Sequence, residues 1–187
     1  MLYFIAIIPP KEVCDEITDF KKDIATRFES KAALRIIPHI TLKAPFQLPA
    51  SDHDRVLDWF QKAVISVSPF VQELKNFGSF KNGRSAVIFV KPEMNNGLDQ
   101  LQKEVLTNFV DHFSAEQVMK SETDFHPHIT IGYRDLRPSM FKQAWAEYRL
   151  KQYSAAFTVT SFDLLQHDKH VWNSISNFVL PDQFNNV

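Results

Sequence analysis

The chain has little of three features that mark common classes of protein: cysteine, an excess of charge of one sign, and long hydrophobic runs. Only 1 of its 187 residues is cysteine, so no disulfide can form within the chain and a reducing compartment is expected. The formal net charge is -1 at pH 7, whereas a protein that holds a long stretch of nucleic acid usually carries a clear positive excess. This balance argues against an extended duplex as a partner.

Long hydrophobic runs are lacking too. The apolar start, residues 2–8, has no basic region before it and ends in Pro9 and Pro10 without a small-residue cleavage site, so it predicts a buried first strand and not a signal peptide. No stretch approaches the length that spans a bilayer. We therefore expect a cytoplasmic protein with no membrane partner. Because the sequence shows no low-complexity segment or flexible linker, we expect a single two-lobed domain over residues 1–187.

One short motif occurs twice. Pro-His-Ile-Thr stands at residues 38–41 and again at residues 127–130. Each copy lies in a segment with β-branched residues and alternating apolar and polar positions, which predicts strands over residues 35–44 and 126–134. Side chains alternate across a strand, so the histidine and the threonine of each copy point to the same face. Each strand therefore presents one imidazole beside one hydroxyl.

The two copies occupy matching places in a larger repeat, because residues 1–84 and residues 85–187 both run strand, proline, helix, histidine strand, helix and strand. In the first half the predicted elements are a strand over 2–8, a helix after Pro10, the strand over 35–44, a helix capped by Ser51 and a strand over 70–77. In the second half they are a strand over 86–90, a helix over 98–113, the strand over 126–134, a helix opened by Pro138 and a strand over 157–162. A hairpin over 164–180, with its turn at 167–170, follows.

The repeat is too long for a solenoid and suggests a duplication with pseudo-two-fold symmetry. Such symmetry would bring His39 and Thr41 to face His128 and Thr130 across a cleft between two lobes. A histidine titrates near neutral pH, so one imidazole can accept a proton while the other donates one. Threonine hydroxyls can donate hydrogen bonds to phosphate oxygens. The four side chains predict cleavage of a phosphodiester without a metal, and the symmetry leaves open which histidine is the acid.

Two other interpretations of the histidines carry less weight. A single His-x-Thr occurs often by chance, but two copies at matching places in a repeat favour one shared site. The pairs His126 and His128, and His167 and His170, have spacings that suggest a metal site, yet Asp124 is the only evident further ligand near the first pair. We therefore expect no metal and no other cofactor.

Strand alternation extends the predicted site by two basic residues. Lys43 should share the face of His39 and Thr41, and Arg134 should follow His128 and Thr130 on the same face. Either side chain would supply positive charge to a phosphate, or else lie at a solvated strand end.

Three aromatic residues are candidates for stacking on a base, namely Tyr3, Phe46 and Phe80. The chain contains 17 phenylalanines, so packing in the core is the simpler expectation for any one of them.

These features resemble the two-histidine (2H) phosphoesterase superfamily, in particular its bacterial 2'-5' RNA ligase-like branch. The His-x-Thr motifs at residues 39–42 and 128–131 meet the family signature, and residues 4–10 and 69–80 are similar to its first and mid-chain strands. The resemblance covers nearly the whole chain. It implies an α+β fold in which antiparallel sheets line a central cleft and helices lie outside. It also implies that one lobe carries both termini and the other the central part of the chain.

For function, the resemblance implies metal-independent opening of a cyclic phosphodiester, with His39 and His128 as acid and base and with Thr41 and Thr130 holding the phosphate. The implied substrates are the 2',3'-cyclic phosphate of a nucleotide or RNA end, or ADP-ribose cyclic phosphate. Two alternatives stay open: a non-catalytic module that binds a nucleotide in the same cleft, and cleavage or ligation of 2'-5' linkages in RNA. We expect a small phosphorylated molecule or an RNA terminus as partner, and a monomeric protein.

Overall fold

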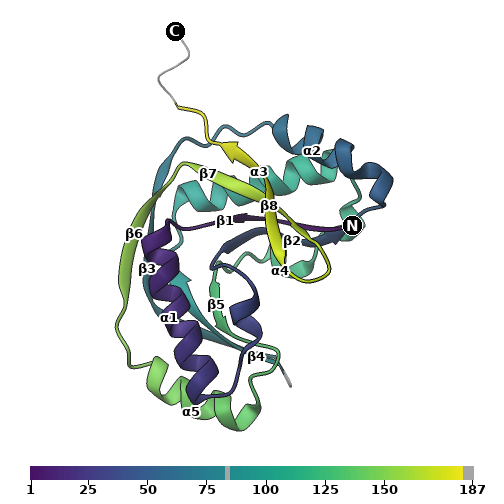
Figure 1. Ribbon diagram of the computed structural model, residues 1–187. Helices are drawn as coiled ribbons and strands as arrows, with labels where there is room; N and C mark the ends of the chain where they lie inside the picture. The colour runs from purple at the N-terminus through teal and green to yellow at the C-terminus, as the bar shows by residue number, and fades with distance from the viewer. Residues whose placement is uncertain (83–84, 183–187) are drawn as a thin grey trace.

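The structure is a computed structural model that describes residues 1–82 and 85–182 (Figure 1). Its strands are β1 (Leu2–Ile7), β2 (Ile40–Gln47), β3 (Phe70–Asn82), β4 (Ser85–Pro92), β5 (Ile129–Gly132), β6 (Ser154–Val159), β7 (Ser161–His167) and β8 (Trp172–Val179). Its α-helices are α1 (Lys11–Arg27), α2 (His53–Gln61), α3 (Asn96–His112), α4 (Lys120–Thr123) and α5 (Pro138–Tyr148). Three short 3-10 helices are η1 (Ala32–Arg35), η2 (Ala50–Asp52) and η3 (Ala115–Gln117).

The strands form two antiparallel sheets. One has the strand order β2-β1-β7-β8, and we call it the terminal sheet because it contains strands from both ends of the chain. The other has the order β5-β4-β3-β6, and we call it the central sheet because its strands come from the middle of the chain. This arrangement confirms the α+β fold with two lobes that the resemblance implied.

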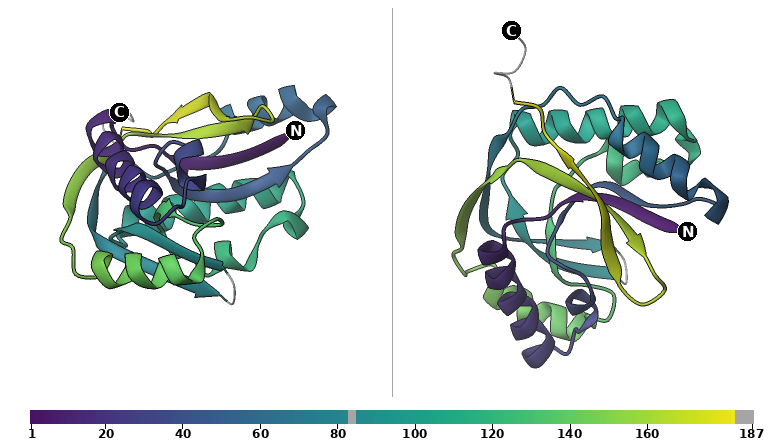
Figure 2. Two further views of the ribbon diagram at one scale, coloured as in Figure 1. Left: turned by 60° about the horizontal axis from the view of Figure 1, so that its bottom comes forward. Right: turned by 45° about the horizontal axis from the view of Figure 1, so that its top comes forward.

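The two sequence halves interleave in both lobes. β3 belongs to the first half, but it pairs with β4 and β6 of the second half, and β7 of the second half pairs with β1 of the first. The helices also pack on strands of the opposite half. α1 of the first half packs against β5 of the second, and α3 of the second half packs against β2 of the first. Figures 1 and 2 show α1 and α5 beside the central sheet, and α2 and α3 beside the terminal sheet. Each lobe is therefore built from both halves.

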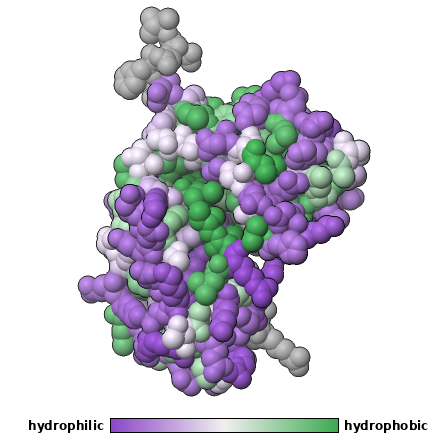
Figure 3. Space-filling view, in the orientation of Figure 1, coloured by the Kyte–Doolittle hydropathy of each residue, from purple (hydrophilic) through white to green (hydrophobic). Residues whose placement is uncertain are grey.

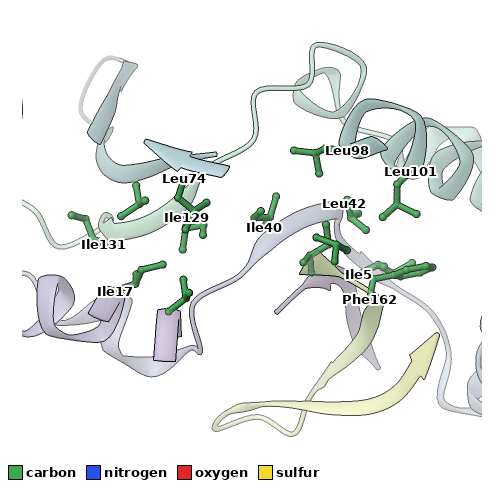
Figure 4. Close-up of a cluster of buried hydrophobic side chains, with 14 of the residues drawn as sticks. Ile5, Ile17, Ile40, Leu42, Leu74, Leu98, Leu101, Ile129, Ile131 and Phe162 are labelled. Atoms are coloured by element: carbon green, nitrogen blue, oxygen red, sulfur yellow. The ribbon is translucent and has the colours of Figure 1, made fainter. Parts of the chain in front are cut away.

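One hydrophobic core runs through both lobes. In Figure 4, Ile17 of α1 lies on the side of Ile129, Leu101 of α3 lies on the side of Leu42, and Ile40 lies between the two groups. Each of these five side chains is at most 1% exposed. Because side chains alternate along a strand, burying the isoleucine of each motif turns its histidine and threonine to the opposite face of the sheet.

Several helix ends follow from local sequence. α1 begins directly after the two prolines, and Pro138 is the first residue of α5, where its missing N–H costs nothing. Asn95 caps α3, because its side-chain oxygen accepts a hydrogen bond from the backbone N–H of Leu98 at 2.9 Å. The predicted terminal hairpin is confirmed as β7 and β8, joined through residues 168–171.

The structure corrects some predicted boundaries. The strand predicted from residue 35 begins at Ile40, because η1 ends at Arg35 and residues 36–39 form neither helix nor strand, and the strand predicted over 126–134 shortens to β5. Ser51 does not cap a helix: it lies within η2, and α2 begins at His53 without a side-chain cap. None of the helices in the described residues is long and apolar enough to cross a membrane.

Candidate active site

The two histidines of the repeated motif have the same local geometry. His39 stands just before β2 and His128 just before β5, and each of these strands lies at one edge of its sheet. Nδ1 of His39 is 2.8 Å from the carbonyl oxygen of Ile37, and Nδ1 of His128 is 2.8 Å from the carbonyl oxygen of His126. Each imidazole is thus held by the carbonyl two residues before it, so the repeat in the sequence is also a repeat in the structure.

These hydrogen bonds assign the tautomer of each imidazole. A carbonyl oxygen can only accept a hydrogen bond, so Nδ1 must carry the proton. In the neutral ring Nε2 is then the nitrogen without a proton, and it can accept one or, once protonated, donate one. Both imidazoles therefore offer Nε2 for acid–base chemistry.

A cavity of 170 Å³, which we call the active-site cavity, is lined by residues of both motifs, although His128 is not among its lining residues. His39 and Thr41 line it from the terminal sheet, and Thr130 lines it from the central sheet. The remaining walls are Phe4, Ala33, Ile36, Pro45, Tyr133, Arg134 and Trp172. Two threonines that are far apart in the sequence thus reach one small space.

His128 lies against two aromatic rings at the edge of the central sheet. Its ring centroid is 5.2 Å from that of Phe80 and 5.5 Å from that of Phe89. Gly78 leaves room for the Phe89 ring, because a Cβ at residue 78 would lie 2.4 Å from that ring. When His128 is protonated, its charge lowers the pKa of His39, so the protonation of one imidazole disfavours that of the other.

Burial shifts both imidazoles toward the neutral form. Desolvation lowers the pKa of His39 to about 4, and the charges of Lys21 and His128 act in the same direction, while the hydrogen bond to Ile37 opposes them. Desolvation also lowers the pKa of His128, with a smaller contribution from His126. His39 is therefore neutral at pH 7 in the free protein, and the pKa of His128 is shifted in the same direction.

Arg134 lines the active-site cavity, but not because of strand alternation. β5 ends at Gly132, and Arg134 follows in a turn with a φ of 55°, in the left-handed region. Its guanidinium carbon lies 5.1 Å from the centroid of the Tyr133 ring. The turn, and not the strand, brings this charge to the cavity.

Asp135 holds the same turn against η1, although no pattern in the sequence predicted it. Its carboxylate accepts hydrogen bonds from the hydroxyl of Ser30 at 2.7 Å and from the backbone N–H groups of Lys31 at 2.8 Å and Ala32 at 3.0 Å. Asp135 and Ser30 are 105 residues apart, so no local pattern could pair them. The carboxylate joins two segments that both contribute walls to the active-site cavity.

The comparison with protein families decides the identity of the fold. The model of the 2'-5' RNA ligase superfamily matches residues 9–171. The chain belongs to this superfamily. The match confirms the resemblance that the two His-x-Thr motifs suggested.

Relatives from bacteria agree with this assignment. A protein of Geobacillus kaustophilus named "Putative phosphoesterase GK0864" is 30% identical over 181 residues, which cover 96% of each chain. A protein of Staphylococcus epidermidis named "Putative phosphoesterase SERP0604" is 25% identical over 185 residues, which cover 96% of this chain and 99% of its own.

Solved structures share the fold at lower identity. TT0787 of Thermus thermophilus superposes with a TM-score of 0.70 at 20% identity and covers 98% of this chain and 100% of its own. Escherichia coli LigT, solved with 3'-AMP, superposes with a TM-score of 0.62 at 18% identity and covers 96% of this chain and 98% of its own.

In this member of the 2'-5' RNA ligase superfamily Lys43 lies in the interior, so the prediction that it shares the face of Thr41 was wrong. Ala6 pairs with Thr41 but Ile5 pairs with Lys43, so β2 contains one extra residue at this point and its alternation reverses. Lys43 is 0% exposed, and its Nζ lies 3.1 Å from the carboxylate of Glu122.

Tyr3 and Phe46 are also core residues, so neither is placed to stack on a base. They are 0% and 2% exposed, and their rings stack on each other with centroids 5.6 Å apart. The Tyr3 hydroxyl lies 2.9 Å from Nδ1 of His53. Phe80 is half-buried and contacts His128 from the side.

In this member of the superfamily, His126 and His167, whose spacing suggested a metal site, form hydrogen bonds with the backbone. His126 is exposed and hydrogen-bonds through Nδ1 to the carbonyl oxygen of Asp124 at 2.9 Å. Nδ1 of His167 accepts a hydrogen bond from the backbone N–H of Lys169 in the terminal hairpin. Within residues 1–82 and 85–182, no three His, Cys, Asp or Glu side chains gather as a metal site would require.

Proposed function

We propose that the protein is a phosphoesterase that hydrolyses a cyclic phosphodiester without a metal. The candidate substrates are the 2',3'-cyclic phosphate of a nucleotide or RNA end and ADP-ribose cyclic phosphate. The observation that carries this proposal is the matched geometry of His39 and His128, each with Nδ1 on a backbone carbonyl and Nε2 free for proton transfer. The phosphoesterase names of its relatives support chemistry on phosphate esters, and LigT structures with 3'-AMP and with phosphate support a small phosphorylated ligand.

In the proposed reaction, water attacks the phosphorus in line with the ribose oxygen that leaves. One imidazole takes a proton from the water while the other gives a proton to the leaving oxygen. A new P–O bond forms, the bond from phosphorus to the ribose oxygen breaks, and the product is a phosphate monoester. No further reactant is needed.

We assign the base to His39 and the acid to His128. The base must be neutral in the resting protein, and burial together with the positive charge of Lys21 lowers the pKa of His39 to about 4. An anionic phosphate near His128 would favour its protonated form, as the acid requires.

Thr41, Thr130 and Arg134 are the candidates for holding the phosphate. The two hydroxyls line the active-site cavity from opposite sheets, and each can donate a hydrogen bond to a phosphate oxygen. The guanidinium of Arg134 carries a permanent charge and enough donors to offset charge that builds on the phosphate during the reaction.

The test is hydrolysis of adenosine 2',3'-cyclic phosphate in the presence of EDTA. We expect turnover by the wild-type protein and a loss of about 10²–10⁴-fold in rate for His39→Ala and for His128→Ala. His170→Ala, which removes an exposed imidazole in the terminal hairpin, is the matched control and should keep full activity. Full activity in both active-site variants would contradict the proposal, and saturable binding without turnover of any cyclic phosphate would favour a binding module.

A further inference from the structure

A second, larger cavity of 610 Å³ adjoins the active-site cavity. We call it the α1 groove, and the lining residues that matter here are Thr18, Lys21, Arg35, Ile36 and Trp172. Ile36 and Trp172 line both cavities, so a molecule bound beside His39 can extend past these two side chains into the groove. Figure 3 shows apolar surface along the hollow between the two lobes.

The α1 groove contains a buried cation that lacks a counter-charge. Lys21 is 2% exposed, and its Nζ donates a hydrogen bond to the carbonyl oxygen of Ile36 at 2.8 Å. Among the residues that the structure describes, Lys21 forms no ion pair and no other hydrogen bond. An ammonium group has three protons to donate, so two of them are left for a ligand. Burial lowers the pKa of Lys21 to about 8, which still leaves most of the group charged at pH 7.

Buried charges in proteins are normally paired, so the buried ammonium of Lys21 indicates that an anion binds beside it. The other charged residues of the groove do not provide one. Lys11 and Asp15 form an exposed ion pair with each other, which neutralises both. Arg35, at the end of η1, is exposed and adds a second positive charge to the lining of the groove. The net charge of the α1 groove therefore favours an anion.

Trp172 supplies an apolar surface where the two cavities meet. It is half-buried, and its ring packs edge-on against Phe4 with centroids 4.6 Å apart. An indole in this position can contact a sugar or stack on a base, while the charges of the groove contact a phosphate.

We propose that the α1 groove is a subsite for a second phosphate group of the substrate, held by Lys21 and Arg35, while the cyclic phosphate lies at His39. This inference rests on the proposed function. ADP-ribose cyclic phosphate carries such a group in its diphosphate, and two other kinds of substrate also carry one. One is an oligonucleotide that ends in a cyclic phosphate, whose nearest internal phosphodiester would enter the groove. The other is a nucleoside cyclic phosphate that has a phosphate on its 5' oxygen.

The experiment compares kcat/KM for three substrates: adenosine 2',3'-cyclic phosphate, the same nucleotide with a 5'-phosphate, and a diadenosine dinucleotide that ends in the cyclic phosphate. We expect the wild-type protein to prefer at least one of the two larger substrates by roughly tenfold or more, as a charge-assisted hydrogen bond would provide. The preferred substrate identifies the source of the second phosphate. Lys21→Met should lower this preference roughly tenfold.

Two further variants make the comparison specific. Lys22→Met removes the same charge from the same helix, but Lys22 is exposed and pairs with Asp19, so the preference should not change. Arg35→Gln should lower the preference without disturbing a buried residue, which keeps the test valid if Lys21→Met folds poorly. A change in the pKa of His39 affects all three substrates alike, so the ratio of kcat/KM values isolates the subsite.

Equal kcat/KM values for all three substrates in the wild-type protein would overturn the inference. So would a Lys21→Met variant that loses the same factor on every substrate, because Lys21 would then act only by supporting the Ile36 backbone. Neither of these outcomes would contradict the proposal that the protein hydrolyses a cyclic phosphate. Absence of hydrolysis of every cyclic phosphate would instead refute the proposed function, and the subsite with it.

Discussion

At the scale of single residues, the candidate site depends on which nitrogen of each imidazole is held. Nδ1 of His39 and Nδ1 of His128 are both engaged with backbone carbonyls, so both rings present the same tautomer although they belong to different sheets. The two residues then differ in their electrostatic surroundings. The charge of Lys21 acts on His39 and lowers its pKa further, whereas the neighbouring charge that lowers the pKa of His128 is that of His126. This difference is the basis for the roles proposed above for two residues that the sequence motif leaves equivalent.

We expect kcat/KM to follow a bell-shaped pH profile with its maximum on the acid side of about pH 6.5, the ordinary imidazole pKa. The productive free protein has a neutral base and a protonated acid, and burial lowers the pKa of both His39 and His128. Because a bound phosphate favours protonated imidazoles, the maximum of kcat should lie at higher pH than that of kcat/KM. Initial rates across a pH series at low and at saturating substrate measure both profiles. A maximum of kcat/KM on the alkaline side of neutrality would contradict the assignment.

A second residue-scale prediction concerns the buried ion pair. The Glu122 carboxylate accepts hydrogen bonds from Lys43 and from the backbone N–H groups of Ala44 at 2.7 Å and Met119 at 2.6 Å. Glu122→Gln keeps the shape but leaves the Lys43 ammonium buried without its counter-charge. We expect the free energy of unfolding to fall by about 3–5 kcal/mol, as measured by urea denaturation.

The control adds Lys43→Met to Glu122→Gln, which removes the orphaned charge and should recover part of the loss. The recovery should be incomplete, since the backbone N–H groups of Ala44 and Met119 still lose a charged acceptor. If Glu122→Gln unfolds at the same urea concentration as the wild-type protein, the ion pair does not stabilise the fold.

At the scale of elements, the sequence predicts what depends on one segment and fails where two segments meet. The spacing of apolar residues in α1, the proline that opens α5 and the turn of the terminal hairpin are local signals, and all three hold. Lys43 was misplaced because the extra residue in β2 exists only relative to β1. Asp135 was missed because its partner Ser30 follows α1 and lies 105 residues earlier in the chain. Arg134 lines the cavity because it lies in a turn with a left-handed φ, and the residues on either side of it in the sequence do not predict that conformation.

Asp135 gives a prediction for the contact between η1 and the turn after β5. Burial alone would raise the pKa of Asp135, but the hydrogen bonds from Ser30 and from the N–H groups of Lys31 and Ala32 lower it overall. Its contribution to stability is therefore complete above the unfolded pKa of about 3.9 and is lost as the pH falls through the lower folded pKa. We expect Asp135→Ala to lower the free energy of unfolding by about 1–3 kcal/mol at pH 7.

Urea denaturation of the wild-type protein and of the Asp135→Ala variant at neutral and at strongly acidic pH measures this effect. The difference between the two proteins should shrink at the acidic pH. Asp135→Asn, which keeps one accepting oxygen, should lose less at neutral pH. A difference that stays constant across the pH range would show that the charge of the carboxylate does not matter.

At the scale of the whole molecule, the repeat in the sequence predicted two lobes but not how they are assembled. The matching order of elements over 1–84 and 85–187 suggested a duplication. It could not show that β3 leaves its own half to pair with β4 and β6, or that β7 returns to β1, because strand order depends on partners and not on pattern. The exchange brings each histidine motif to a sheet that contains strands of both halves.

This interleaving predicts that neither half folds alone. A fragment over residues 1–84 would contain β1 and β2 without β7, and β3 without β4 and β6, so its apolar faces and strand edges would stay open. The fragment over residues 85–187 has the complementary defect. We expect each fragment to lack a cooperative thermal transition in circular dichroism, and an equimolar mixture to regain both the transition and the hydrolysis of cyclic phosphate. The reason is that the hydrophobic core needs both fragments. Ile40 from one fragment belongs to the same buried cluster as Ile129 from the other. A fragment that unfolds cooperatively by itself would show that its lobe does not need the exchanged strands.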